Sequence, residues 1–305
     1  MTPTRREFLS ASLAVAATAA AAPAKDDISL AAWSLNASHE AGKWNNLELP
    51  KILRETLGIN GLEYVNTYFD NPTLGYLRKL KKSLADYRIT SVTLMVDDED
   101  PTAGPDKSER MEAAIAHRRW IDIAHFLGCR QIRANMRGGM KEWKKDKDLV
   151  NRAAETFRHI LEYAKGSGVG LIVENHGGAS SDPDLLVALM KAVNDPNFGM
   201  LVDFGNWNPG ENKYEAIRKT IPYGKGVSVK GWYGPGGNPE FDTEKAIRIC
   251  LEGGYHGFWG VESSPFRLES SERGAKKSPD EIWRSDVSAV LATKALVERT
   301  VLKKG

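Results

Sequence analysis

Three acidic residues of this chain each end a short apolar run: Glu174 follows Leu-Ile-Val, Asp203 follows Met-Leu-Val, and Glu262 follows Trp-Gly-Val. Such runs are typical of buried β-strands, and a carboxylate at the end of a buried strand is costly unless a cation meets it. A salt bridge is the simpler explanation for any one of these acids alone. The candidate partners are Lys230, Arg133 and Arg267. Three such acids converging on one place favour a shared divalent ion instead.

Oxygen ligands suit a hard or borderline ion such as Mg2+, Mn2+ or Zn2+. An ion of this kind polarises the carbonyl and hydroxyl groups of a bound substrate, which lowers the cost of forming an enediolate. Glu174 and Glu262, on opposite sides of the substrate, could then remove and return a proton, one on each face of a carbon. The predicted chemistry is proton transfer next to a carbonyl, with these two glutamates as catalytic residues.

His176 lies two residues after Glu174. Residues i and i+2 of an extended chain are on the same side, so we predict that His176 lies within reach of the metal or of its bound substrate. The alternative is a structural histidine bonded to the carbonyl of a neighbouring loop.

A repeated pattern along the chain predicts the elements that position these residues. A helical stretch ends in glycine, one apolar residue follows, and a short β-rich run comes next, as around Gly128 and Gly168. Glycine after a helix takes the left-handed conformation at no steric cost, so these positions predict helix-to-strand turns. The predicted strands are Ile28–Trp33, Leu62–Val65, Ser91–Val96, Gln131–Asn135, Leu171–Glu174, Met200–Asp203, Gly226–Lys230 and Phe258–Glu262.

Amphipathic segments separate these strands, and helix starts are predicted at Asp182 and Ser278, each of which is followed by proline. Eight strand-then-helix units in a chain of this length predict an α/β fold, a single (β/α)8 TIM barrel over residues 25–305. A doubly wound open sheet is the alternative, but no GxGxxG motif follows any predicted strand.

The carboxyl ends of the strands carry the active site in such a barrel. Lys230 ends the seventh predicted strand and is predicted to be catalytic, by neutralising an enediolate oxygen or orienting a substrate hydroxyl, although it could also pair with Asp203 or Glu262. Other aromatic and polar residues at or just beyond strand ends are predicted to bind the substrate. They are Glu63, Trp33, Asn135, Trp232 and Arg267. Each aromatic residue, taken singly, is more often a packing residue.

The chain resembles the xylose isomerase-like TIM-barrel superfamily, and within it the sugar phosphate isomerase/epimerase branch, in its strand-end sequences: Gly-Leu-Glu63-Tyr, Leu-Ile-Val-Glu174-Asn-His-Gly-Gly, Leu-Val-Asp203-Phe-Gly-Asn, Val-Ser228-Val-Lys230 and Gly-Val-Glu262. The resemblance covers nearly the whole chain after residue 24. It implies one divalent metal held by Glu, Asp, His and Glu, with the two glutamates acting as acid and base on keto sugars or polyols. By position, the metal ligands are Glu174, Asp203 and Glu262.

Ser228 departs from this pattern. Members of the superfamily usually have His-Val-Lys on the seventh strand, and Ser228 stands where that histidine would be. Either three carboxylates and water hold the metal more weakly, or another group, such as His176, fills the place.

Residues 1–24 are predicted to be a twin-arginine-type signal peptide. Arg5-Arg6 precedes Phe8-Leu9 and an alanine-rich apolar run that is too short to span a bilayer. The alternatives are an ordinary Sec signal or a weak anchor. We expect an exported, periplasmic protein with no stable membrane insertion after signal removal.

The overall composition argues for a small, neutral ligand. Lys+Arg 42 against Asp+Glu 40 gives a net charge of +2, which provides no general attraction to nucleic acid. The predicted partner is a carbohydrate, and a homo-oligomer is left open. The two cysteines, Cys129 and Cys250, form no CxxC motif and are predicted to be packing residues.

The leading hypothesis is an exported, metal-dependent isomerase or epimerase that acts through an enediolate on a keto sugar or polyol. The second is a lyase or dehydratase that uses the same enolisation to expel a leaving group from the β-carbon of a keto-glycoside or keto-polyol. The third is a non-catalytic sugar-binding barrel that has lost its metal, because Ser228 replaces the expected histidine.

Overall fold

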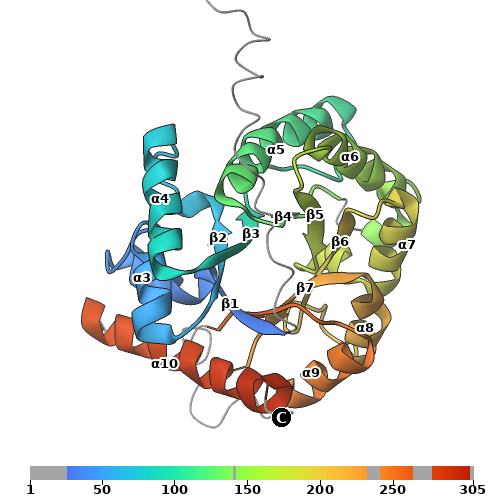
Figure 1. Ribbon diagram of the computed structural model, residues 1–305. Coiled ribbons are helices and arrows are strands. Elements are labelled where there is room, and N and C mark those ends of the chain that lie inside the picture. Colours follow the sequence, from blue (N-terminus) through green and yellow to red (C-terminus); the bar gives the residue numbers. More distant parts are fainter. Residues whose placement is uncertain (1–25, 140–141, 232–240, 264–276, 303–305) are drawn as a thin grey trace, which may run out of the picture.

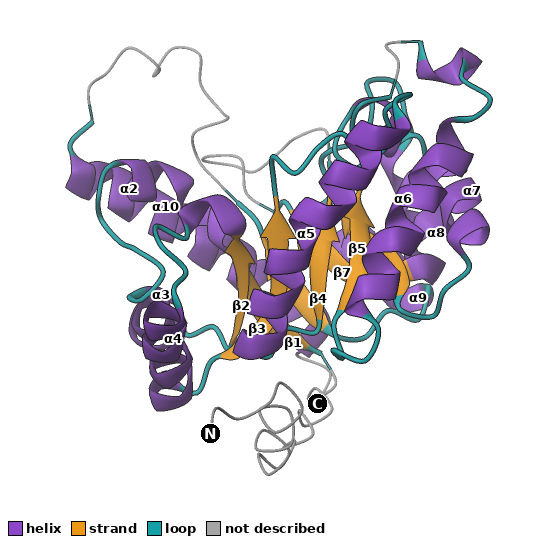
Figure 2. Ribbon diagram, turned by 90° about the horizontal axis from the view of Figure 1, so that it is seen from above, coloured by secondary structure: helices purple, strands orange, loops and turns teal. Residues whose placement is uncertain are grey.

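Eight parallel strands close into a barrel in chain order, with β1 paired to both β2 and β8. The computed structural model describes residues 26–139, 142–231, 241–263 and 277–302. The strands are β1 Asp27–Ala31, β2 Gly61–Val65, β3 Thr90–Val96, β4 Gln131–Ala134, β5 Gly170–Glu174, β6 Phe198–Asp203, β7 Gly224–Val229 and β8 Phe258–Val261. Figures 1 and 2 show the helices outside these strands. The predicted single (β/α)8 TIM barrel is confirmed.

The main helices lie between consecutive strands or after the last one. They are α4 Leu74–Tyr87, α5 Lys107–Leu127, α6 Leu149–Ala164, α7 Pro183–Val193, α8 Lys213–Thr220, α9 Thr243–Glu252 and α10 Pro279–Val297. Two shorter helices, α2 Asn36–Glu40 and α3 Leu49–Ile52, occupy the connection between β1 and β2. No helix in the described ranges is long and apolar enough to cross a membrane.

Helices α7 and α10 begin at the side-chain caps that the sequence predicts. The Asp182 carboxylate accepts hydrogen bonds from the backbone N–H groups of Asp184 and Leu185, at 2.9 and 3.1 Å, at the start of α7. Ser278 and Glu281 form a capping box at the start of α10. Gly128 ends α5 with φ 84°, a conformation that a side chain would strain.

Four strands end earlier than predicted, and this places side chains at the barrel mouth. β1 ends at Ala31 because residues 32–35 form a 3-10 turn in which Ser34 Oγ donates to the Val261 carbonyl, at 3.0 Å. Strands β4, β7 and β8 each end one residue before the predicted boundary. Lys230 and Glu262 therefore lie just beyond their strands.

Apolar side chains fill the barrel interior below the mouth. Ala31, Met95, Ile172 and Leu201 form one buried cluster, and Trp33 packs against it. Both cysteines are buried and free, as expected for packing residues.

A buried aspartate joins the last helix to the first. Asp286 of α10 is fully buried, and its Oδ2 accepts hydrogen bonds from both the backbone N–H, at 3.0 Å, and the hydroxyl of Ser38 in α2. Burial raises the pKa of Asp286 to about 6, against the opposing effect of these hydrogen bonds. The folded state therefore favours the protonated form.

We expect Asp286→Asn to flatten the pH dependence of stability. The protonated carboxyl contributes up to about 3 kcal/mol, present in full below the unfolded pKa of about 4 and lost as the pH rises through about 6. The free energy of unfolding in urea, measured from pH 4 to 7, should fall less for the variant than for the wild type. Asp280→Asn, at an exposed site on the same helix, is the control. Equal slopes for Asp286→Asn and the wild type would contradict the assignment.

Candidate active site

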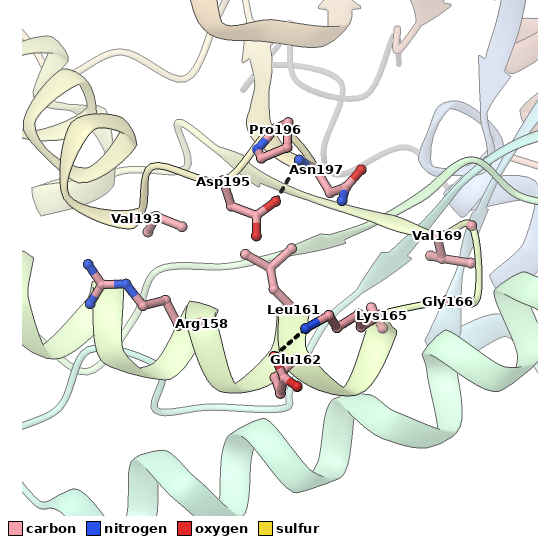
Figure 3. A pocket seen from close by; sticks show the side chains of 12 residues that line it. Arg158, Leu161, Glu162, Lys165, Gly166, Val169, Val193, Asp195, Pro196 and Asn197 are labelled. Atoms are coloured by element: carbon pink, nitrogen blue, oxygen red, sulfur yellow. Dashed lines mark hydrogen bonds and ion pairs between the residues drawn. The ribbon is translucent and has the colours of Figure 1, made fainter.

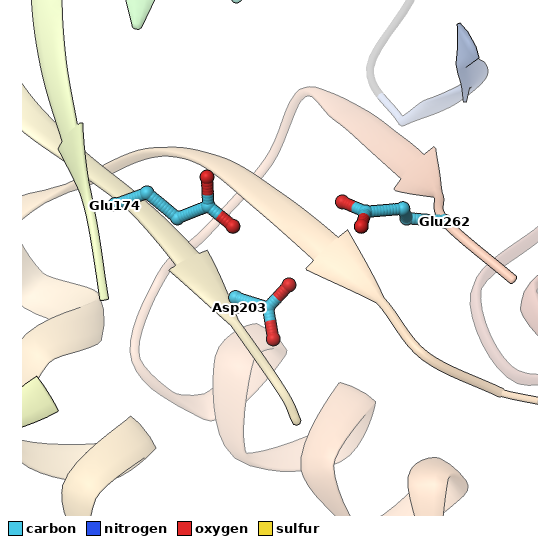
Figure 4. Close-up of side chains that lie close together, drawn as sticks. All are labelled: Glu174, Asp203 and Glu262. Atoms are coloured by element: carbon cyan, nitrogen blue, oxygen red, sulfur yellow. The ribbon is translucent and has the colours of Figure 1, made fainter. Parts of the chain in front are cut away.

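Three carboxylates meet at the carboxyl ends of the strands. Glu174 and Asp203 are the last residues of β5 and β6, and Glu262 directly follows β8. One oxygen atom from each lies within 4.8 Å of the other two (Figure 4). Glu174 and Asp203 are buried, and Glu262 is half-buried. Residues 29 to 88 positions apart in the chain thus form one acidic cluster, hereafter the carboxylate trio.

Lys230 is the nearest cation to two members of the trio among the described residues. Its Nζ lies 2.9 Å from Asp203 Oδ2 and also contacts Glu262 Oε1. The hydroxyl of Ser228 donates to the second oxygen of Glu262, Oε2, at 2.8 Å. Glu262 is thereby held from two sides by residues of the β7 end.

Arg133 of β4 contacts Glu174, the third member of the trio. Its side chain is 1% exposed, and its Nε lies 3.0 Å from Glu174 Oε2. Its Nη1 donates to Asp97 Oδ1, at 2.8 Å, and to the Val96 carbonyl, at 3.0 Å. The salt bridges considered from the sequence are therefore present for both Lys230 and Arg133, whereas Arg267 lies outside the described residues.

The buried charges do not balance. Five carboxylates, those of the trio with Glu63 and Asp97, share the barrel mouth and interior with two cations, Arg133 and Lys230, in the part of the chain that the structure describes. If all five were ionised, three negative charges would remain unmatched, and excess charge at buried sites is strongly unfavourable. A bound cation or bound protons must neutralise these three negative charges.

The pKa values show where protons go when no metal is bound. Burial, together with the charges of Glu262 and Asp203, raises the pKa of Glu174 to about 8 even though Arg133 opposes it. Burial would also raise the pKa of Glu262, but Lys230 and Ser228 outweigh it and lower that pKa. The pKa of Lys230 is raised, because the three carboxylates outweigh its burial. At neutral pH Glu174 therefore holds a proton, whereas Glu262 is ionised beside the Lys230 ammonium.

The trio fits a divalent metal ion. All three side chains offer carboxylate oxygens, the donors that Mg2+, Mn2+ and Zn2+ accept. Asp203 Oδ2 is buried and accepts no hydrogen bond from any described residue, although Lys230 Nζ lies nearby. Asp203 Oδ1, in contrast, accepts from the backbone N–H groups of Gly205 and Asn206, at 2.7 and 2.8 Å. One oxygen is fixed by the protein, and the other meets only the Lys230 ammonium among the described residues.

A comparison with known protein families identifies the family of this chain. Residues 53–287 match the xylose isomerase-like TIM barrel family, which is well over half of the chain. The chain belongs to that family.

Several solved structures share the fold of this family member at low sequence identity. One titled L-ribulose 3-epimerase is 18% identical with a TM-score of 0.70, and the match covers 91% of this chain and 95% of that one. A D-allulose 3-epimerase from Methylomonas sp. in complex with D-allulose is 13% identical with a TM-score of 0.69, covering 91% and 98%. A xylose isomerase-like TIM barrel protein from Mycobacterium smegmatis in complex with magnesium is 18% identical with a TM-score of 0.60, covering 88% and 97%. No curated protein sequence was found to match the chain.

His176 does not join the carboxylate trio of this xylose isomerase-like barrel. The prediction assumed that the chain stays extended beyond Glu174, but β5 ends there, and Asn175 instead exchanges hydrogen bonds with the backbone of Asp203, at 2.8 and 2.9 Å. The His176 side chain is exposed, and its Nδ1 lies 3.3 Å from Arg137 Nη2.

Of the predicted substrate-binding residues, Glu63 and Asn135 are buried and Trp33 is half-buried. Glu63 is 3% exposed and lies within β2, where the Ser29 hydroxyl donates to its Oε1. Its other oxygen has no partner among the described residues, and burial raises its pKa to about 7. Asn135 is buried and donates to Asp97 Oδ1, at 2.9 Å. Trp33 is half-buried above the interior cluster, with its ring edge-on to that of Tyr68, 5.5 Å between centroids.

Trp232 and Arg267 lie outside the described residues, so their predicted contacts with a substrate remain predictions. The structure adds positioning residues that sequence reasoning missed. Asn206 donates from its side chain to Glu174 Oε1, at 3.2 Å, as well as from its backbone to Asp203. The sequence carried a signal only for the backbone contacts, because an aspartate in a turn often accepts a backbone N–H group two residues later, here that of Gly205.

A surface cavity of about 580 Å3 lies elsewhere on the barrel (Figure 3). Val169 and Asn197, which line it, directly precede β5 and β6. It therefore sits at the amino ends of these strands, whereas Glu174 and Asp203 are at their carboxyl ends. This cavity is not part of the carboxylate site.

We expect Arg133→Met to lower the free energy of unfolding by about 3–5 kcal/mol at neutral pH, because the change leaves the buried, ionised Asp97 carboxylate without its cation and removes the contact with Glu174. Urea unfolding in the presence of a chelator would measure this loss. Arg137→Met is the matched control, since the Arg137 side chain is 41% exposed and its loss should cost less than about 0.5 kcal/mol. Equal costs for the two variants would show that Arg133 is not the buried counter-ion.

Proposed function

We propose that this protein is a divalent-metal-dependent isomerase or epimerase that moves a proton next to the carbonyl of a keto sugar. The observation that carries the proposal is the convergence of Glu174, Asp203 and Glu262 within 4.8 Å at the carboxyl ends of the strands. The fold shared with L-ribulose 3-epimerase, with D-allulose 3-epimerase bound to D-allulose, and with a magnesium complex supports this substrate class and the use of a metal.

Glu174, Asp203 and Glu262 would hold the metal, which supplies Lewis-acid polarisation of the substrate carbonyl when bound. Asp203 is the most rigid of the three, because two backbone N–H groups fix one of its oxygens. Asn206 and Arg133 hold Glu174, and Ser228 and Lys230 hold Glu262. Each carboxylate is therefore oriented before a substrate arrives, which is what efficient proton transfer requires.

The two glutamates face each other from β5 and from the end of β8 (Figure 4). A sugar carbon placed between them would meet a carboxylate on either face, so one glutamate removes the proton and the other returns one. The Lys230 side chain, at the end of β7, would bring its ammonium to a substrate oxygen that gains charge during the reaction and neutralise it. The half-buried Trp33 provides an apolar ring surface that suits one side of a neutral sugar.

Glu174→Gln and Glu262→Gln should each reduce turnover by about 10²–10⁴-fold or more, because each removes one proton-transfer group. The measurement is incorporation of solvent deuterium into D-allulose, L-ribulose and related ketoses with Mn2+ present. Arg137→Met, at an exposed position outside the trio, serves as the control. Full exchange activity in either glutamine variant would contradict the acid–base roles. An unsaturated product would point to the lyase reaction.

We also propose that the protein is exported to the periplasm through a twin-arginine signal in residues 1–24, a segment outside the described residues. The Arg5-Arg6 pair before a short apolar run is what supports this. In a host with an active twin-arginine pathway, the periplasmic form should have the mass of a chain cleaved near residue 24. An Arg5→Lys, Arg6→Lys double variant should remain uncleaved in the cytoplasm. Cleavage and export of that variant would favour a Sec signal instead.

A further inference from the structure

Lys230 occupies the same small space that a metal ion would need. Its side chain is 8% exposed, and its Nζ contacts Asp203 Oδ2, at 2.9 Å, and Glu262 Oε1. These two carboxylates belong to a trio whose ligand oxygens lie within 4.8 Å of one another. A divalent ion bound to the trio would sit about 2.0–2.6 Å from such oxygens. The ammonium and the ion would then be near neighbours of like charge.

We infer that the Lys230 ammonium is a built-in counter-cation that competes with a divalent metal for Asp203 and Glu262. This inference rests on the proposed metal site. Without metal, Lys230 meets part of the excess negative charge and keeps the barrel mouth stable. Metal binding requires its ammonium to move away from the two carboxylates, so Lys230 lowers the affinity for the metal.

The Lys230 ammonium can leave its carboxylate partners when a metal binds, whereas the Arg133 guanidinium cannot. Arg133 contacts only Glu174 of the trio, and its guanidinium is also bound to Asp97 and to the Val96 carbonyl. The Lys230 ammonium contacts only carboxylate oxygens of the trio within the described part of the chain. A lysine side chain is a point charge on a flexible four-carbon stem, so it can leave one partner without breaking a rigid two-pronged contact.

The surroundings of Lys230 hold the ligands in place while the ammonium moves. The hydroxyl of Ser228 donates to Glu262 Oε2, an oxygen that Lys230 does not contact. The Asp203 carboxylate is fixed through its other oxygen by two backbone N–H groups. The Lys230 backbone carbonyl accepts a hydrogen bond from Thr243 Oγ1, at 3.3 Å. Only the lysine side chain has to change its rotamer for Asp203 Oδ2 and Glu262 Oε1 to become available to the metal.

The test is calorimetric titration of MnCl2 into chelator-stripped wild type, Lys230→Met and Arg137→Met at one low salt concentration. Removing a like charge from the site should tighten Mn2+ binding by Lys230→Met by about tenfold or more. Arg137→Met removes a positive charge that touches no member of the trio within the described residues, so its Kd should stay within about twofold of the wild type. This control separates direct competition from a general change in charge.

The melting temperature of the variant provides a second measurement. In chelator, Lys230→Met should melt at a lower temperature than the wild type, because fewer cations face the trio. Excess Mn2+ should then raise its melting temperature by more than it raises that of the wild type. If Lys230→Met is unfolded without metal, folding on addition of Mn2+, seen by circular dichroism, supports the inference, and failure to fold overturns it.

Unchanged or weaker Mn2+ binding by Lys230→Met, with normal binding by the wild type, would overturn the competition and leave the proposed metal-dependent function intact. Equal tightening in Arg137→Met would also overturn it, since the effect would then not depend on contact. Absence of Mn2+ binding in all three proteins would end both the inference and the metal dependence of the proposed function.

Discussion

The excess of negative charge at the mouth of the barrel constrains everything around it. Five carboxylates share the mouth and the interior below it with two buried cations in the described part of the chain. Carboxylates at such depth cannot all be ionised without compensation. Protons on Glu174 and Glu63, the ammonium of Lys230 and a divalent metal are alternative ways to supply it. A site that can exchange these sources of positive charge is suited to moving protons.

The barrel scaffold makes this concentration of charge possible. Parallel strands that all end at one rim bring their last side chains together, and backbone groups at the strand ends hold them. Asn175 binds both the N–H and the carbonyl of Asp203, so the ends of β5 and β6 are locked to each other. The buried Arg133 provides a second, fixed link between the ends of β3 and β5, through Asp97 and Glu174. The apolar interior and the helices around it stabilise the fold and so offset the cost of bringing the acids together.

Much of the fold and of the acidic site was predictable from the sequence. Glycine after helices, proline-marked caps at Asp182 and Ser278, and short apolar runs were sufficient to predict eight strands in the right order. An acid that ends an apolar run points to the same rim in every case, so the meeting of Glu174, Asp203 and Glu262 followed from the barrel. His176 does not lie with the three acids, because residue spacing predicts the side of a side chain only while the backbone stays extended, and β5 ends at Glu174. Its predicted reach to a bound substrate stays a prediction.

Local pattern therefore established which residues form the strands, which acids finish them and which family they resemble, since periodicity, turn residues and motifs are properties of neighbours in the chain. The sequence offered Lys230 and Arg133 as candidate partners, but packing decided which acid each of them meets. Lys230 could have paired with either of two acids, and it contacts both. Arg133, Ser228 and Asn206 each took a role that depends on which strand lies beside which and on the direction of a side chain. Contacts between segments distant in sequence depend on strand register and rotamer, and short-range sequence patterns do not specify either.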